Sequence, residues 1–137
     1  MISEIVKNQV WLGPINEAIS FKYNEFRTIV DVLENPSISV EIQNQLKARG
    51  ISYVHQSFVY SDKDGYMKAN LDKLMYIRYL INKNKPCIVC CAASIERSPL
   101  AVAWYIHEEN EIDIQKAYEI VTTAHPITQD RSSWLPL

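Results

Sequence analysis

Two apolar runs on either side of a short polar segment near residue 91 constrain the fold of this chain more than any other feature. Residues 86–90 are apolar, include β-branched side chains and begin at a proline, which predicts a short buried strand. Residues 100–106 are apolar on every side, which predicts a buried helix. The two runs therefore predict a strand, a tight loop and a helix in direct succession.

Strand and helix patterns alternate along the rest of the chain. Strands are predicted over residues 10–12, 28–33 and 51–59, and helices over residues 39–48, 71–81 and 114–124. This alternation predicts an α/β fold of three layers, in which a central, mostly parallel sheet is flanked by helices. No linker or repeat divides the chain, so residues 1–137 are expected to form one domain. In such a sheet, ligands bind beyond the carboxyl ends of the strands.

Composition excludes several classes of function. The net charge is −2 and neither sign forms blocks, so we expect no nucleic-acid partner and no membrane partner. Three cysteines are an odd number and do not suggest a disulfide framework, which favours a reducing, cytoplasmic compartment. The first residues lack the basic and apolar regions of a signal peptide, and no apolar run approaches the length of about 20 residues that spans a membrane.

The polar segment between the strand and the helix has the composition of an anion site. Five residues separate Cys91 from Arg97, and Ser98 and Pro99 then begin the helix, with Ser98 as the expected N-cap. Backbone N–H groups of such a loop and the positive end of the helix dipole attract a phosphate and stabilise a thiolate. The planar guanidinium of Arg97 can bind two phosphate oxygens at once. The segment therefore predicts chemistry on a phosphate group.

The reaction that these groups favour is nucleophilic displacement at phosphorus. A free cysteine titrates near 8.5, so lowering that value by about three units requires roughly 4 kcal/mol of preference for the thiolate. Cys91 would attack phosphorus and form a phosphocysteine intermediate, while an acid protonates the departing oxygen. Asp62, in a loop after another predicted strand, is the expected acid, with Asp64 as the alternative.

These residues resemble the small dual-specificity phosphatases of the Cys-dependent protein tyrosine phosphatase superfamily, over roughly residues 2–126. The resemblance includes Arg97, Ser98 and Pro99 with the helix that follows, the opening strand at residues 10–14, and the spacing of Asp62 from Cys91. It implies that Cys91 is the nucleophile, that Arg97 binds phosphate, and that Asp62 is the general acid and base. It also implies that Ser98 assists breakdown of the intermediate. The backbone of the loop would hold the phosphate, through Ala92, Ala93, Ser94, Ile95, Glu96 and Arg97.

Two positions depart from the family pattern. Cys90 stands where the family usually has a histidine before the nucleophile, and Ser94 stands where it usually has a glycine. A side chain in a strained conformation at position 94 costs on the order of 1 kcal/mol. The loop contains Ala92 and Ile95 in place of the lysines of phosphoinositide-directed members. Glu96 adds a negative charge, so phosphotyrosine on proteins is the expected substrate, with phosphoserine and phosphothreonine as a second class.

Two other functions are compatible with the sequence. Cys90 and Ser94 suggest a pseudophosphatase that binds phosphorylated partners with little or no turnover. The proximity of Cys87, Cys90 and Cys91 suggests thiol redox regulation. The chain's histidines, His55, His107 and His125, show neither metal-ligand spacing nor pairing with a nucleophile, so we interpret each as structural or exposed and expect no metal or other cofactor.

Overall fold

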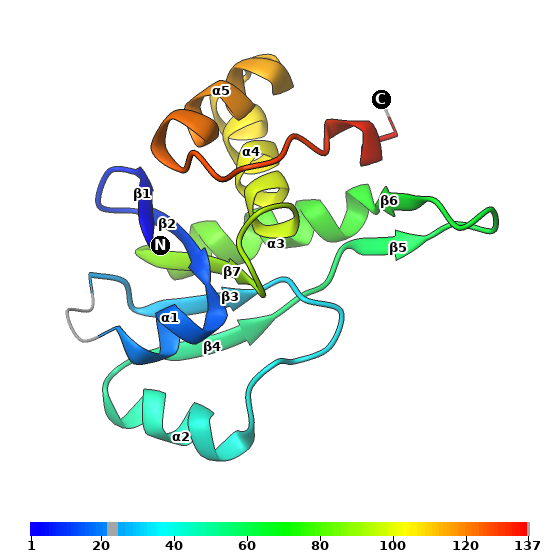
Figure 1. Ribbon diagram of the computed structural model, residues 1–137. Coiled ribbons are helices and arrows are strands. Elements are labelled where there is room, and N and C mark those ends of the chain that lie inside the picture. Colours follow the sequence, from blue (N-terminus) through cyan, green and yellow to red (C-terminus); the bar gives the residue numbers. More distant parts are fainter. Residues whose placement is uncertain (22–24, 137) are drawn as a thin grey trace.

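The computed structural model describes residues 1–21 and 25–136. Its main sheet has the strand order β1-β2-β7-β3-β4. The first strand is antiparallel to its neighbour and the remaining pairs are parallel, as Figure 1 shows. The strands are β1 (Ser3–Val6), β2 (Val10–Pro14), β7 (Cys87–Cys91), β3 (Thr28–Asp31) and β4 (Ser52–His55).

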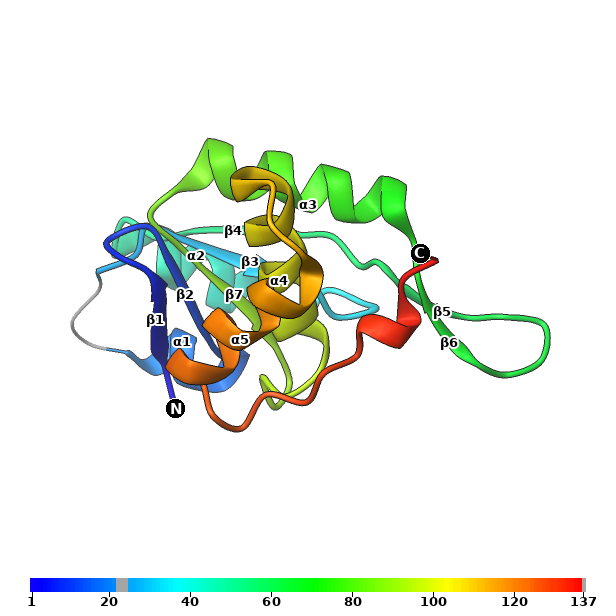
Figure 2. The same cartoon turned by 90° about the horizontal axis from the view of Figure 1, so that it is seen from above.

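Helices cover both faces of this sheet. On one face lie α1 (Ile15–Ser20) and α2 (Val40–Ala48), and on the other lie α3 (Leu71–Asn84), α4 (Arg97–Asn110) and α5 (Ile114–Ala124) (Figure 1). A separate pair of strands, β5 (Val59–Ser61) and β6 (Met67–Ala69), extends to one side as a hairpin. Figure 2 shows it beside the C-terminal 3₁₀ helix η1 (Ser132–Trp134). The expected three-layer α/β fold with a mostly parallel sheet is confirmed.

The central strand β7 joins the two hydrophobic cores. All of its side chains are buried. Alternate residues point to opposite faces of a strand. Accordingly, Cys87, Val89 and Cys91 enter the core under α3, α4 and α5. Ile88 and Cys90 enter the core under α1 and α2. A strand buried on both faces needs a continuous apolar run, which is the pattern that predicted it.

Gly13 allows β2 to lie close to its neighbours. A Cβ atom there would lie 2.8 Å from Cγ1 of Ile2 and 3.2 Å from Cδ1 of Ile88. The strand continues past this glycine to Pro14, which pairs with Cys91. The prediction that the strand ends at residue 12 is therefore wrong, because here the glycine serves close packing within a strand.

The single strand predicted over residues 51–59 is two strands in different sheets. β4 pairs with β3 from Ser52 to His55, and β5 pairs with β6 from Val59 onward. Between them Phe58 turns into the core, and its carbonyl accepts the N–H of Asn70 at 2.8 Å. The pattern of apolar and polar residues indicates which side chains are buried, but it does not show where a strand changes its pairing partner. The two strands were therefore predicted as one.

The predicted helices are confirmed with small changes of boundary. Ser39 caps α2 by accepting the N–H of Ile42, and Gly50 follows that helix with φ of +79°. The helix predicted over residues 71–81 is α3, which begins at Leu71 and continues to Asn84. The strands β1 and β6 and the helices α1 and η1 were not predicted, because each is too short to show a period. Within the described residues, no helix combines the length and the apolar content needed to cross a membrane.

Candidate functional site

The site lies where β7 ends and α4 begins, at the carboxyl edge of the parallel strands. Cys91 is the last residue of β7 and Arg97 is the first residue of α4, so residues 92–96 form the connecting loop. The loop borders a cavity of about 240 Å³. Met67 of β6 and Trp134 of η1 complete its lining, with Cys91, Ala92, Ala93, Ile95, Glu96 and Arg97. Both the expected nucleophile and most of the expected phosphate-binding loop therefore face one cavity.

The sulfur of Cys91 lies at the N-terminus of α4. It accepts the backbone N–H of Ser98 at 3.5 Å and lies 3.2 Å from the Ser98 hydroxyl oxygen. The N–H groups of a first helical turn have no partner inside the helix, and they carry the positive end of its dipole. The sulfur therefore lies beside a backbone N–H, a hydroxyl group and the N-terminal end of a helix.

The sequence had predicted Ser98 as the N-cap of the helix, and this prediction is wrong. The N-cap is Glu96, whose side chain makes no capping hydrogen bond, and the helix begins at Arg97. Ser98 is fully buried. Its hydroxyl is directed to the cysteine because the helix starts earlier than the Ser-Pro pair suggested.

Arg97 has an incomplete set of partners. Its Nη2 lies 3.4 Å from Oε1 of Glu34, which is in the loop after β3. Among the described residues its buried Nε–H has no hydrogen-bond partner. Leaving such a donor unpaired costs about 1–3 kcal/mol, and more for a charged group. A phosphate in the adjoining cavity would satisfy it.

Glu34 is placed by a hydrogen-bonded turn anchored on Asp31. One oxygen of the buried Asp31 accepts the N–H of Leu33 at 3.0 Å. The other accepts the N–H and the hydroxyl of Ser37 and the hydroxyl of Tyr53. Burial, followed by the hydrogen bond to Asp31 and its charge, raises the pKa of the Tyr53 hydroxyl, so it remains a donor. From the sequence, the loop of Glu34 was expected to influence the depth of the pocket, but its ion pair with Arg97 was not predicted.

The C-terminal segment braces the loop from outside. The N–H of Gln129 donates to the carbonyl of Ile95 at 2.9 Å. The guanidinium of Arg131 lies 3.0 Å from the Glu96 carboxylate and over the ring of Trp134. The charge of Glu96, which the sequence analysis counted against polyanionic substrates, is thus offset by Arg131.

Ser94 is held in an unusual backbone conformation. Its φ is +57°, a left-handed value that favours glycine, and its side chain is fully buried. The Ser94 hydroxyl lies 3.2 Å from the Ser98 hydroxyl and 3.1 Å from Nε2 of His125. Ser94 is absent from the cavity lining, unlike the other predicted loop residues, because its side chain points into the protein.

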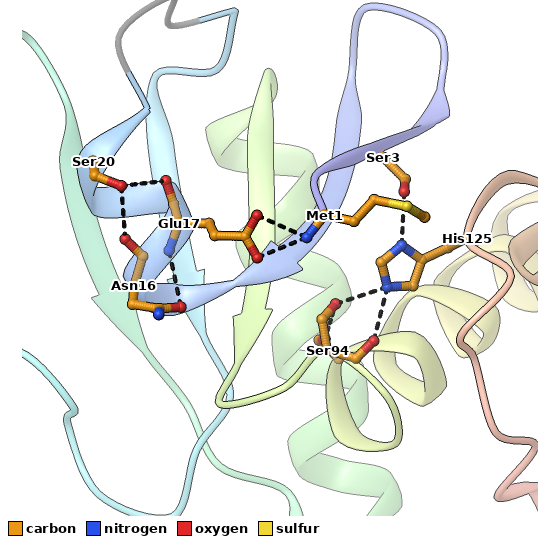
Figure 3. A network of polar contacts seen from close by, with 8 residues as sticks. Met1, Ser3, Asn16, Glu17, Ser20, Ser94 and His125 are labelled. Carbon is orange, nitrogen blue, oxygen red and sulfur yellow. Dashed lines mark hydrogen bonds and ion pairs between the residues drawn. The ribbon is translucent and has the colours of Figure 1, made fainter.

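His125 was interpreted from the sequence as structural or exposed, and the structure shows a buried histidine that contacts Ser3 and Ser94 and not Cys91 itself. It is fully buried at the end of α5. Figure 3 shows it between Ser94 and Ser3. Its Nδ1 lies 2.7 Å from the Ser3 hydroxyl and its Nε2 lies 2.8 Å from the Ser94 carbonyl oxygen. No local sequence signal could have found this contact, since residues 3 and 125 are brought together only by the packing of α5 against β1.

The expected acids lie on the neighbouring hairpin and do not line the cavity. Oδ1 of Asp62 accepts the N–H groups of Asp64 and Tyr66, both at 2.9 Å. Asp62 follows Ser61, whose strand partner is the cavity residue Met67. Asp64 is exposed farther along the turn. Asp62 therefore lies next in sequence to the residue that pairs with the cavity wall.

The cysteines are not arranged for a disulfide. All three are free and buried. Burial raises the pKa of Cys87 to about 12, and burial, followed by the charge of Cys91, raises that of Cys90 well above its ordinary value. Cys90 and Cys91 point to opposite faces of β7, and Cys87 is four residues, or about 13 Å, along the strand from Cys91. Cβ atoms in a disulfide are about 4 Å apart, so this geometry does not favour the redox hypothesis.

Comparison with known proteins gives a fold but no close relative. No family model matches the sequence, and no curated protein is similar to it. Among solved structures, PTPMT1 is 19% identical with a TM-score of 0.73, covering 98% of this chain and 88% of its own. The PTP-2 phosphatase of Cydia pomonella is 17% identical with a TM-score of 0.74, covering 97% and 84%. DUSP15 is 16% identical with a TM-score of 0.73, covering 97% and 81%. The chain therefore has the fold of the small tyrosine and dual-specificity phosphatases, as the sequence predicted.

Proposed function

We propose that this protein is a Cys-dependent phosphatase that hydrolyses phosphotyrosine on proteins. The observation that carries the proposal is the convergence of Cys91 and Arg97 on one cavity, where the Nε–H of Arg97 has no hydrogen-bond partner among the residues that the structure describes. A thiolate, a bidentate cation and a helix N-terminus are what transfer of a phosphoryl group to sulfur requires.

The proposed reaction has two displacements. The Cys91 thiolate attacks phosphorus, so that an S–P bond forms and the bond to the tyrosine oxygen breaks, while Asp62 gives its proton to that oxygen. Asp62 then takes a proton from water, the water oxygen attacks phosphorus, and the S–P bond breaks to release phosphate and the thiolate. The Ser98 hydroxyl, 3.2 Å from the sulfur, stabilises the returning charge. Arg97 and the backbone of the 92–97 loop hold the phosphate oxygens in both steps.

The cavity walls favour an aromatic substrate. Met67 and Trp134 are apolar residues that line the cavity together with the loop. They can pack against a phenyl ring. PTPMT1, whose fold is similar, has been solved in a complex with PI(5)P. The present loop has no lysine, and Glu34 adds a negative charge beside Arg97, which together favour the aryl monoester over an inositol lipid.

The test is hydrolysis of a phosphotyrosine peptide and of p-nitrophenyl phosphate, with Cys91→Ser as the control for contamination. Mass spectrometry of quenched wild-type reactions should find a phosphoryl group on Cys91. Hydrolysis that persists in Cys91→Ser would refute the proposal. Phosphopeptide binding without turnover in the wild type would instead identify a pseudophosphatase, the alternative that Cys90 and Ser94 suggest. Vesicles containing PI(5)P give the comparison with lipid substrate.

The same assay identifies the acid. We expect Asp62→Ala to lower kcat on the peptide by about 10²-fold or more and to remove the basic limb of the pH profile. We expect a smaller loss on p-nitrophenyl phosphate, whose leaving group needs less protonation. Asp64→Ala is the matched control on the same turn. If the basic limb disappears in Asp64→Ala and not in Asp62→Ala, the assignment is reversed.

A further inference from the structure

A continuous chain of polar contacts leads from the interior of the protein to the nucleophile. It runs from Nε2 of His125 to the Ser94 hydroxyl at 3.1 Å, on to the Ser98 hydroxyl at 3.2 Å, and then to the Cys91 sulfur at 3.2 Å. His125, Ser94 and Ser98 are fully buried, and Cys91 is 5% exposed. Contacts of this kind in a dry interior hold their orientation, because water does not compete for the donors.

The partners of His125 determine which of its nitrogens carries the proton. Burial lowers the pKa of His125 below its ordinary value, the Ser94 carbonyl raises it, and the positive amino group of Met1 and the negative Glu17 act in opposite directions. The ring is therefore neutral at pH 7, with one N–H. Nε2 lies 2.8 Å from a carbonyl oxygen, which can only accept, so the proton is on Nε2. Nδ1 then accepts from the hydroxyl of Ser3 at 2.7 Å.

This tautomer orients the hydroxyl groups of Ser94 and Ser98. Nε2–H has no lone pair to offer, so the Ser94 hydroxyl can only accept from it. The proton of Ser94 is then directed to the Ser98 oxygen, which is its other partner among the described residues. The proton of Ser98 in turn is directed to the sulfur of Cys91. A protonated imidazole would also carry a proton on Nε2, so the direction does not depend on titration of the ring.

We propose that His125 is a positioning residue for the nucleophile, which acts through Ser94 and Ser98 to point the Ser98 hydroxyl proton at the Cys91 sulfur. This inference rests on the proposed function, because the orientation serves catalysis only if Cys91 is the nucleophile. The experiment measures ionisation of the Cys91 thiol and does not require turnover. A hydroxyl that always donates to sulfur stabilises the thiolate before substrate arrives and the leaving thiolate afterwards.

The experiment measures how fast iodoacetamide alkylates Cys91 as a function of pH, with the Cys91 peptide quantified by mass spectrometry. Cys87, Cys90 and Cys91 lie on one tryptic peptide, residues 84–97, so fragment ions that divide this peptide between Cys90 and Cys91 assign the alkylated residue. We expect the midpoint of the profile to rise by about one pH unit in Ser98→Ala, which corresponds to about tenfold less thiolate below the midpoint. We expect a rise of about half to one unit in His125→Leu. His125→Gln, whose side-chain N–H can reach the position of Nε2, should restore most of the difference.

A double variant separates positioning from a structural role. Because His125 acts through Ser98, adding His125→Leu to Ser98→Ala should move the midpoint by less than about 0.2 unit further. His107 is the matched control, a half-buried histidine whose Nδ1 binds the Ile112 carbonyl at the far end of α4. His107→Leu should leave the profile unchanged.

Two results would overturn the proposal: an unchanged midpoint in folded His125→Leu, or shifts that add fully in the double variant. If His125→Leu does not fold, Ser94→Ala interrupts the same chain at the next residue and carries the same expectations. Alkylation requires no turnover, so an oriented thiolate in a protein without phosphatase activity would contradict the proposed function and leave this inference standing.

Discussion

In the proposed function Glu34 competes with phosphate for Arg97, so replacing Glu34 by glutamine should tighten phosphate binding. The two side chains are 3.4 Å apart, with 59% of the Glu34 side chain and 30% of the Arg97 side chain exposed. At that distance in bulk water the attraction is about 1.2 kcal/mol. Ordering of the side chains and salt reduce exposed pairs to about 0.2–1 kcal/mol. Glu34→Gln should therefore lower the dissociation constant for inorganic phosphate by about 1.4- to 5-fold.

Isothermal titration with inorganic phosphate measures this change without requiring catalysis. In 1 M salt the Debye length falls to about 3 Å, so the difference between Glu34→Gln and the wild type should shrink. The matched control is Glu111→Gln, which removes the same charge at the other end of α4, about 21 Å from Arg97 along the helix. That control should leave the affinity unchanged.

Unchanged or weaker phosphate binding in Glu34→Gln would refute the reasoning, because it would mean that the pair does not restrain Arg97. A second outcome would assign a different role to the same residue. If Glu34→Gln also removes the basic limb of the pH profile for hydrolysis, Glu34 rather than Asp62 supplies the proton to the leaving group.

Three further substitutions test how the site is supported. Gly13→Ala should lower the free energy of unfolding by about 1–3 kcal/mol, since its Cβ would lie 2.8 Å from Ile2; an unchanged urea midpoint would contradict the close packing. Tyr53→Phe removes a donor to Asp31 and should cost about 1.5–3 kcal/mol in the same unfolding assay, whereas a loss below 0.5 kcal/mol would show that this network contributes little. Ser94→Gly should change stability by less than about 1 kcal/mol, because relief of the strained φ offsets the lost hydroxyl, yet it should shift the alkylation profile of the nucleophile as Ser94→Ala does; a large loss of stability would show that the hydroxyl matters mainly for folding.

Local patterns in the sequence were sufficient to predict the strand and the helix on either side of the phosphate loop. The apolar run before Cys91 and the apolar helix after Arg97 have a strong period or a continuous burial pattern, and each spans enough residues to be read without tertiary information. The alternation of strands and helices then implied a mostly parallel sheet, whose carboxyl edge is where the loop lies. This is why the fold class and the convergence of Cys91 and Arg97 could be predicted.

The sequence indicated that the loops near residues 34–36 and 129–130 shape the pocket, but the individual contacts around the phosphate loop were decided by the tertiary structure. Glu34, Met67, Trp134 and His125 reach the site from loops and chain segments that carry no motif, and their positions depend on how distant elements pack. A hydrogen bond between residues 94 and 125 has no signature in either segment.

The sequence by itself determined that a cysteine and an arginine meet at a helix N-terminus, because that requires only a strand, a loop and a helix in order. It also showed that Cys90 stands where a histidine is usual in the family it resembles. Only the tertiary structure revealed that a different histidine is linked to the nucleophile, through Ser94 and Ser98. The physical reason is that backbone preferences are local, whereas buried polar groups take their partners from whichever segments the fold brings within hydrogen-bond distance.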